Sequence, residues 1–152
     1  MWSMIIAAIA VGLDQLTKWL VMTRMTEFQE IPIIEGFFSI QFVYNPGAAF
    51  GILTNQRWLF VIVGIVALFL MFHYLRGPAS RHWMSTLALG LLMGGTVGNL
   101  IDRIRAGEVV DFLLFYWRDY YFPNFNVADT CITVGVGLLL LHLLMMEEKP
   151  KA

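Results

Sequence analysis

Four aspartates lie in or beside the most apolar stretches of this sequence. Asp14 and Asp129 interrupt apolar runs, Asp102 ends another, and Asp111 stands in a Val-Val-Asp-Phe sequence. A charged side chain at the centre of a bilayer costs about 2.5–3.5 kcal/mol on insertion scales, so such residues are functional candidates. Two carboxylates held close together share a proton, which allows one to activate water and the other to protonate a carbonyl oxygen. The aspartates therefore indicate acid–base hydrolysis.

Other hydrolytic chemistries fit the sequence poorly. It contains neither a Gly-x-Ser-x-Gly nor a Gly-x-Gly-Asp motif. His73, His82 and His142 lie far apart, and none has a carboxylate or cysteine partner at the spacing of metal ligands. Cys131 has no nearby histidine and is interpreted as a packing residue. We expect no metal and no other cofactor.

The composition indicates a membrane protein. Of the 152 residues, 59% are hydrophobic and 14% are charged, whereas soluble domains carry roughly 25% charged residues. This apolar excess excludes a disordered chain and a soluble enzyme. The ten Lys and Arg nearly balance the eleven Asp and Glu, so no basic field favours nucleic acid as a partner.

Four apolar runs are long enough to cross a bilayer, which takes about 20 helical residues. They comprise residues 2–22, 58–75, 83–101 and 127–146. The first run lacks a basic leading segment and is interrupted by charges, so we interpret it as a retained helix rather than a signal peptide. We expect a mainly α-helical integral membrane protein with a single domain, residues 1–152.

Two loops rich in aromatic residues separate these spans, residues 23–57 and residues 102–126. In the first loop, alternation along residues 38–44 predicts a strand, with a turn at Glu35-Gly36 and an edge strand at Pro32. A small sheet near the membrane surface follows from this pattern.

Antiparallel spans place both long loops on one side of the membrane. The ends of the spans that carry Asp14, Asp102 and Asp129 lie on that side too. The positive-inside rule weighs Lys and Arg near the span ends. Their counts on the two sides leave the orientation of the protein undecided.

Some of these residues also have purely structural interpretations. Asp14 and Lys18 are four residues apart on one helix face, so they can form an ion pair that fixes helix packing. Gly94, Gly95 and Gly98 in the third span favour close approach of a neighbouring helix. A role in a site and a role in packing both remain open for the ion pair.

The ends of the third and fourth spans carry further polar residues. Asn99, Asp102 and Arg103 share one helix face and can form a hydrogen-bonded cluster. Asn126 can cap the fourth span, and Asp129 is then favoured by the helix dipole. Capping alone does not explain why several acids gather on the same side of the membrane.

Five short motifs follow one another along the chain. They are Asp14-Gln15-Leu16-Thr17-Lys18, Asn45-Pro46-Gly47-Ala48-Ala49-Phe50-Gly51, Gly98-Asn99-Leu100-Ile101-Asp102-Arg103, Val109-Val110-Asp111-Phe112 and Phe125-Asn126-Val127-Ala128-Asp129. Any one of them is a weak signal, but the set in this order is highly specific. With these motifs, nearly the whole chain resembles the bacterial lipoprotein signal peptidases, the signal peptidase II family of aspartyl peptidases.

The resemblance implies a fold and an activity. The implied fold has four membrane helices, both termini in the cytoplasm, and a small extracytoplasmic β-sheet, or cradle, with a loop over the active site. The implied enzyme is an aspartic endopeptidase of the bacterial cell membrane. It removes the signal peptide of prolipoproteins, cutting on the N-terminal side of a Cys that carries a diacylglyceryl group. The implied partners are this substrate, membrane lipid and globomycin-type inhibitors, and a monomer carries the whole motif set.

The resemblance also assigns residues to roles. It implies a catalytic pair, Asp111 and Asp129, near the extracytoplasmic face. The supporting and substrate-binding positions of the family match Asp14, Lys18, Asn45, Asn99, Asp102, Arg103 and Asn126.

The residues alone leave the choice of the pair open, since Asp102 is as good a member as Asp111. We expect Arg103 and Asn99 to hold Asp102 ionised and oriented. Asp111 has no such sequence neighbour, so it is freer to exchange a proton. This modest argument agrees with the assignment that the resemblance implies.

A small membrane transporter or channel subunit, with acidic residues lining a path, is the alternative function. Such a protein spreads ionisable residues through the depth of the bilayer, whereas here they gather toward one end of the spans. A packing or assembly protein in which every acid is structural is a second alternative. A cleavage assay distinguishes the peptidase from the transporter or channel subunit and from the packing protein.

Overall fold

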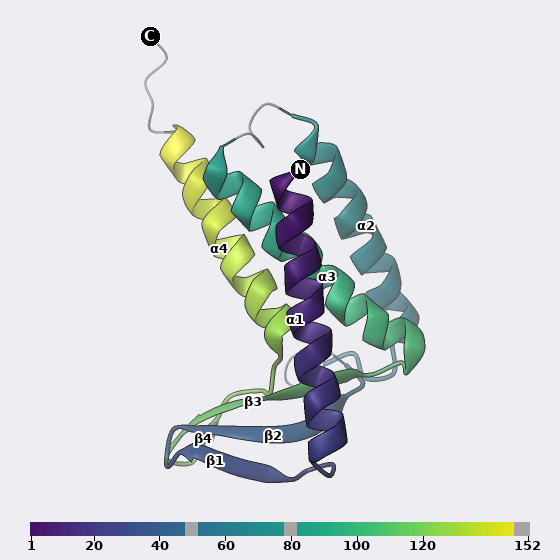
Figure 1. The fold of residues 1–152 in the computed structure, drawn as a ribbon, viewed down its shortest axis with the longest axis vertical. Helices are drawn as coiled ribbons and strands as arrows, with labels where there is room; N and C mark the ends of the chain where they lie inside the picture. Colours follow the sequence, from purple (N-terminus) through teal and green to yellow (C-terminus); the bar gives the residue numbers. More distant parts are fainter. Residues whose placement is uncertain (48–51, 78–81, 148–152) are drawn as a thin grey trace.

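The computed structural model describes residues 1–47, 52–77 and 82–147, and four long helices form its bundle (Figure 1). These helices are α1 (Trp2–Arg24), α2 (Arg57–Leu75), α3 (Trp83–Arg105) and α4 (Val127–Glu147). Each is long and apolar enough to cross a membrane. The predicted membrane fold is confirmed, and the first apolar run forms a helix of the bundle.

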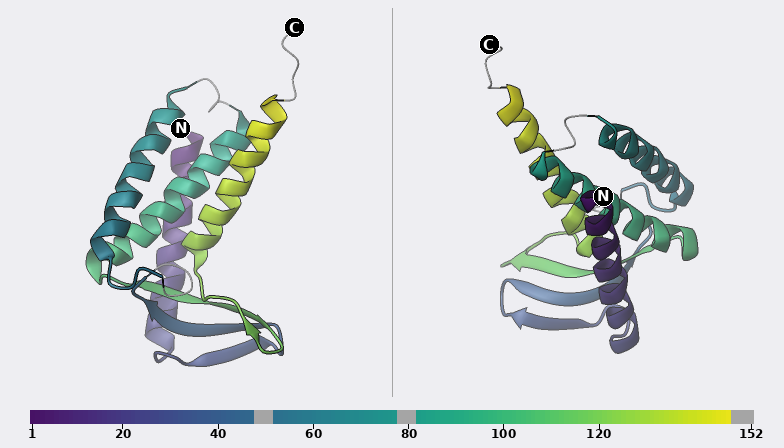
Figure 2. Two further views of the ribbon diagram at one scale, coloured as in Figure 1. Left: turned by 180° about the vertical axis from the view of Figure 1, so that it is seen from behind. Right: turned by 45° about the horizontal axis from the view of Figure 1, so that its top comes forward.

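Helix α3 is the central helix and packs against α1, α2 and α4 (Figures 1 and 2). Its glycines allow this close packing, as predicted. A Cβ atom on Gly94 would lie 2.6 Å from the Cβ of Ala10 in α1. A Cβ atom on Gly95 would collide with the backbone oxygen of Ala128 in α4. Real side chains do not approach so closely, so these two contacts fix α1 and α4 against α3.

Helix α3 is longer than the third predicted span. It continues to Arg105, so Asp102 and Arg103 lie in its last turns and not in the predicted loop 102–126. Hydropathy marks where the apolar run ends, but the backbone hydrogen bonds of a helix continue past that point. The extra turn carries Asp102, whose side chain reaches the buried Lys18 of α1.

Both long loops contribute to one antiparallel sheet across the end of the bundle (Figure 1). Its strands are β1 (Glu30–Ile34), β2 (Phe38–Asn45), β3 (Val109–Trp117) and β4 (Tyr120–Tyr121), in that spatial order. The predicted strand, the turn after β1 and the edge position of Pro32 are confirmed. The first residues of α1 and the last turns of α4 lie at the opposite end of the bundle (Figure 2).

Strand β3 was not expected from the sequence. Its residues run Val-Val-Asp-Phe-Leu-Leu without alternation, because Val109, Val110, Asp111 and Phe112 are all buried. Side chains from both faces of the strand are covered, so the period-2 signal of a half-exposed strand is lost. Strand β3 pairs with β2 and places Asp111 in the interior.

A small apolar cluster joins the sheet to the bundle. It is formed by Val21 of α1, Phe42 of β2, and Val110 and Phe112 of β3, all of them buried. Because the two neighbours of Asp111 belong to this cluster, the packing fixes the backbone on both sides of that carboxylate. The sheet therefore holds Asp111 at a defined place relative to the helices.

Candidate active site

Asp111 of β3 and Asp129 of α4 line the same cavity, which has a volume of about 930 Å³. Its other polar lining includes Asn45, Asn99 and Arg103. The walls are largely aromatic and aliphatic, formed by Phe37, Phe60, Val109, Phe115, Phe122, Pro123, Phe125 and Ile132. The cavity therefore combines two carboxylates with an apolar surface of the kind that accepts an apolar ligand.

Asp111 is held by two side-chain amides. Nδ2 of Asn45 donates to its Oδ2 at 2.8 Å, and Nδ2 of Asn126 donates to its Oδ1 at 2.7 Å. Burial and, to a smaller extent, the nearby carboxylate of Asp129 raise the pKa of the Asp111 carboxyl to about 7. The two amides act in the opposite direction on this pKa, because they favour the ionised form. Asp111 is thus poised to exchange a proton near neutral pH.

Asp129 is fixed at the start of α4 by a reciprocal cap. Oδ1 of Asn126 accepts from the backbone N–H of Asp129 at 2.9 Å, and Oδ2 of Asp129 accepts from the backbone N–H of Asn126 at 3.2 Å. Nδ2 of Asn99 donates to the other oxygen of Asp129, Oδ1, at 2.7 Å. The predicted cap by Asn126 is confirmed, and its amide nitrogen also reaches Asp111.

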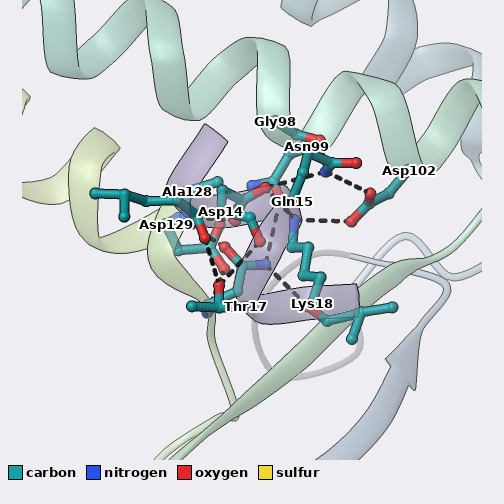
Figure 3. Close-up of polar contacts among 12 residues, drawn as sticks. Asp14, Gln15, Thr17, Lys18, Gly98, Asn99, Asp102, Ala128 and Asp129 are labelled. Carbon is teal, nitrogen blue, oxygen red and sulfur yellow. Dashed lines mark hydrogen bonds and ion pairs between the residues drawn. The ribbon is translucent and has the colours of Figure 1, made fainter. Parts of the chain in front are cut away.

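Lys18 is the centre of a buried polar network between α1 and α3 (Figure 3). Its Nζ lies 2.9 Å from Oδ2 of Asp14, 2.7 Å from Oδ2 of Asp102 and 3.0 Å from Oδ1 of Asn99. Asp14 and Lys18 are 0% and 1% exposed. The predicted ion pair between them is confirmed, and Lys18 also connects it to the amide that holds Asp129.

The predicted pairing of Asp102 with Arg103 is wrong. Asp102 pairs with Lys18 and accepts from Gln15, whereas Arg103 points elsewhere. Consecutive residues of a helix do not face each other, so a neighbour in sequence is a poor guide to an ion pair. Nη2 of Arg103 donates to the carbonyl oxygen of Gly47 at 3.0 Å, and its guanidinium stacks on the ring of Phe60.

Asp14 connects α1 to the start of α4. Its Oδ1 accepts from the backbone N–H of Ala128 at 2.9 Å, one of the N–H groups that the helix itself leaves unpaired. The carboxylate lies directly against Gly98, where a Cβ atom would lie 2.5 Å from Oδ2. The glycine is required here because the carboxylate occupies the space of a side chain.

Gln15 was missed as a site residue. Its Nε2 lies 2.9 Å from Oδ1 of Asp102, 3.2 Å from Oδ2 of Asp14 and 3.3 Å from the carbonyl oxygen of Gly98. A polar residue next to Asp14 in an apolar span was the available signal. The sequence did not show that the face of α1 carrying Gln15 packs against Asp102 of α3.

The structure brings the nine candidate residues together at the sheet end of the bundle. They are Asp14, Lys18, Asn45, Asn99, Asp102, Arg103, Asp111, Asn126 and Asp129. Residues 48–51 of the second motif lie outside the described residues. Within the described ranges, no group of three or more His, Cys, Asp or Glu could hold a metal ion.

The comparison with protein families decides the identity. A family model described as Signal peptidase (SPase) II matches residues 6–145. The chain belongs to the signal peptidase II family. It is 63% identical over 152 residues to a lipoprotein signal peptidase of Symbiobacterium thermophilum, covering 100% of both chains. It is 41% identical over 151 residues to a lipoprotein signal peptidase of Bacillus pumilus, covering 99% of this chain and 97% of the other.

Solved structures agree with this membership in the signal peptidase II family. One described as a bacterial membrane enzyme superposes with a TM-score of 0.90 at 36% identity, covering 99% of this chain and 93% of the other. A second, with the same description, gives a TM-score of 0.85 at 37% identity over 93% and 92% of the two chains. The chain is therefore a multi-pass membrane enzyme of the aspartic peptidase type, and the transporter and channel alternatives are set aside.

Proposed function

We propose that this signal peptidase II removes the signal peptide of bacterial prolipoproteins, cutting on the N-terminal side of a diacylglyceryl-modified Cys. Asp111 and Asp129 form the catalytic pair. The observation that carries the proposal is the convergence of these two carboxylates, from a strand and a helix that lie apart in sequence, on one cavity with apolar walls. The relatives named lipoprotein signal peptidase support the choice of substrate.

The surroundings of the two carboxylates differ, and this difference favours a protonated Asp111 and an ionised Asp129. Asp111 titrates near neutral pH, with a pKa of about 7, and its neighbours in the strand are apolar. Asp129 lies in the first turn of α4, where the helix dipole stabilises a negative charge. In the resting enzyme Asp111 therefore holds the shared proton, and Asp129 is the ionised base.

The hydrolysis follows from this arrangement. Asp129 takes a proton from a water molecule, whose oxygen attacks the scissile carbonyl carbon, while Asp111 gives its proton to the carbonyl oxygen. The tetrahedral species then collapses: the C–N bond breaks, Asp129 returns its proton to the leaving amine, and the hydroxyl proton returns to Asp111. The pair regains its starting state without any other reactant.

The surrounding donors have separate tasks. Asn45, Asn99 and Asn126 already donate to the two carboxylates, so they orient the pair. Arg103 lines the cavity with a guanidinium that carries five N–H donors. It is the charged group placed to bind a substrate carbonyl or the developing oxyanion.

The membrane completes the positioning of the substrate. Phe60 of α2 and Ile132 of α4 place apolar surface beside the carboxylates. A substrate anchored by its acyl chains and its signal peptide meets the pair at a fixed depth, which reduces the entropy lost on reaching the reactive geometry. We propose that the sheet faces the extracytoplasmic side, that both termini are cytoplasmic, and that a monomer is sufficient because one chain carries every site residue.

A cleavage assay on the purified protein tests the function. Matched synthetic prolipoproteins with and without the diacylglyceryl group are compared, and only the modified one is expected to be cleaved. Globomycin should block the cleavage, and a chelator should leave it unchanged, since the proposed chemistry uses no metal. Equal cleavage of both substrates would contradict the proposed specificity.

A further inference from the structure

Gln15 is half-buried and reaches from α1 to α3 beside the buried network around Lys18 (Figure 3). Its shortest contact, at 2.9 Å, is from Nε2 to Oδ1 of Asp102. The same nitrogen also faces Oδ2 of Asp14 at 3.2 Å. Gln15 therefore brings N–H donors to two carboxylates in a part of the chain that spans the membrane.

These two carboxylates share a single cation. Nζ of Lys18 donates a hydrogen bond to Oδ1 of Asn99 and lies within ion-pair distance of Oδ2 of Asp14 and Oδ2 of Asp102. For the other oxygen of Asp102, Oδ1, Gln15 is the only donor in the part of the chain that the structure describes. A nearly buried carboxylate oxygen without a donor is costly, so Asp102 would turn and draw Lys18 toward itself.

We propose that Gln15 is a positioning residue of the peptidase. By holding Asp102, it keeps Lys18 directed at Asn99, whose amide orients Asp129. Lys18 can only donate, so the oxygen of Asn99 must face it and the nitrogen of Asn99 must face Asp129, 2.7 Å away. The inference rests on the catalytic role proposed above for Asp129.

A residue that merely joins two helices would behave differently. Helices α1 and α3 remain joined without Gln15, because Lys18 still pairs with Asp102 and Gly94 still packs against Ala10. Gln15 is also not among the residues that line the cavity. Its substitution should therefore change the turnover and its pH dependence, and leave substrate binding and folding close to those of the parent protein.

The test compares Gln15→Leu with a matched control, Gln56→Leu, on the diacylglyceryl-modified substrate. Gln56 precedes α2, is exposed, and makes no side-chain cap. For Gln15→Leu we expect kcat to fall about tenfold, which corresponds to roughly 1.4 kcal/mol, with KM within about twofold of the parent value. Gln56→Leu should keep the parent values.

The pH dependence of kcat distinguishes a positioning role of Gln15 from a packing role. An N–H donated to a carboxylate favours its ionised form, so weakening the Asn99 contact should move the acidic limb of the kcat profile to higher pH. The charged groups around Asp129 are Asp111 from β3, Arg103 from α3 and Lys18 from α1. Gln15→Leu replaces none of them, and of the three only Lys18 is expected to shift.

Two results would overturn the inference. One is a parent-like kcat in Gln15→Leu. The other is a reduced kcat with an unchanged pH profile and a lowered unfolding midpoint. If Gln15→Leu does not accumulate, Gln15→Met keeps the length of the side chain but removes the donor, and a parent-like kcat in that variant overturns the inference instead.

The aspartate variants distinguish this inference from the proposed function. Inactive Asp111→Asn and Asp129→Asn proteins together with a parent-like Gln15→Leu protein contradict only the role of Gln15. Cleavage by either aspartate variant contradicts the catalytic pair itself.

Discussion

The side-chain nitrogen of Asn126 lies 2.7 Å from Oδ1 of Asp111, which joins the start of α4 to strand β3. The oxygen of the same amide caps α4 by accepting from the backbone N–H of Asp129. One buried side chain thus positions both members of the proposed catalytic pair. Because the backbone N–H can only donate, it also fixes which end of the amide faces Asp111.

Two functions of Asn126 can be separated by substitution. Asn126→Ala should lower the free energy of unfolding by about 1 kcal/mol for the lost cap and should also reduce kcat. Asn126→Ser restores a capping oxygen without the amide, so it should recover the unfolding midpoint and leave kcat low. Thermal unfolding in detergent and a cleavage assay measure the two. A fully active Asn126→Ser protein would show that the contact with Asp111 is dispensable.

The activity should fall as the pH rises through about 7. Asp111, with a pKa of about 7, is the proposed acid, and it must carry a proton to protonate the substrate carbonyl. The basic limb of the kcat/KM profile therefore reports its titration. A profile that stays flat between pH 6 and pH 9 in the parent protein would be inconsistent with Asp111 as the acid.

The stability should also depend on pH through Asp111. The pKa of this carboxyl in the folded protein, about 7, lies above the ordinary value of 3.8, so the folded state binds more protons between these values. Its contribution to stability is fully present below about pH 4 and is lost as the pH rises through about 7. The total approaches roughly 4 kcal/mol, at 1.36 kcal/mol per pKa unit.

Asp111→Asn is the control for this pH dependence of the unfolding free energy. The variant cannot titrate at this position, so its unfolding free energy should decline less than that of the parent protein between pH 5 and pH 8. Unfolding followed in detergent at both pH values gives the comparison. Equal declines in the two proteins would mean that Asp111 is not protonated in the folded state near neutral pH.

Asp14→Ala should impair folding more than chemistry. It removes one partner of a buried ion pair and the acceptor for the backbone N–H of Ala128. Breaking a buried pair costs about 3–5 kcal/mol, so we expect low accumulation in the membrane. Asp14→Asn keeps an oxygen for Ala128 and should accumulate better. Parent-like accumulation and activity of Asp14→Ala would show that the pair with Lys18 is dispensable.

Gly95→Ala tests the close approach of α3 and α4. The added methyl group would meet the backbone oxygen of Ala128, next to Asp129, so α4 must shift. Overpacking of this kind costs about 1–3 kcal/mol, and the shift should lower kcat as well. Gly12→Ala is the matched control, because a Cβ atom there meets nothing within 4 Å. Similar unfolding midpoints for the two variants would contradict the packing argument.

The features that the sequence predicted correctly are local or compositional. The four spans follow from hydropathy, the pair of Asp14 with Lys18 follows from helix spacing, and the cap by Asn126 follows from its place before an apolar run. Each depends on residues within a few positions of one another, so no knowledge of the tertiary arrangement was needed.

The features that the sequence missed depend on contacts between distant segments. Strand β3 has no alternating pattern because both of its faces are covered by other elements. Asp102 pairs with Lys18, far away in sequence, rather than with the adjacent Arg103. Gln15 gains its partners only when α1 and α3 pack together. These contacts come from helix packing, which the spacing of residues along one chain segment does not define.

The cleavage activity of Asp111→Asn and Asp129→Asn, measured on purified and folded protein, tests the catalytic pair most directly. General acid–base groups contribute about 10²- to 10⁴-fold to a rate, so each variant should lose at least that factor in kcat while still binding the diacylglyceryl-modified substrate. A turnover close to that of the parent protein in either variant would contradict the assignment of Asp111 and Asp129 as the pair that activates water.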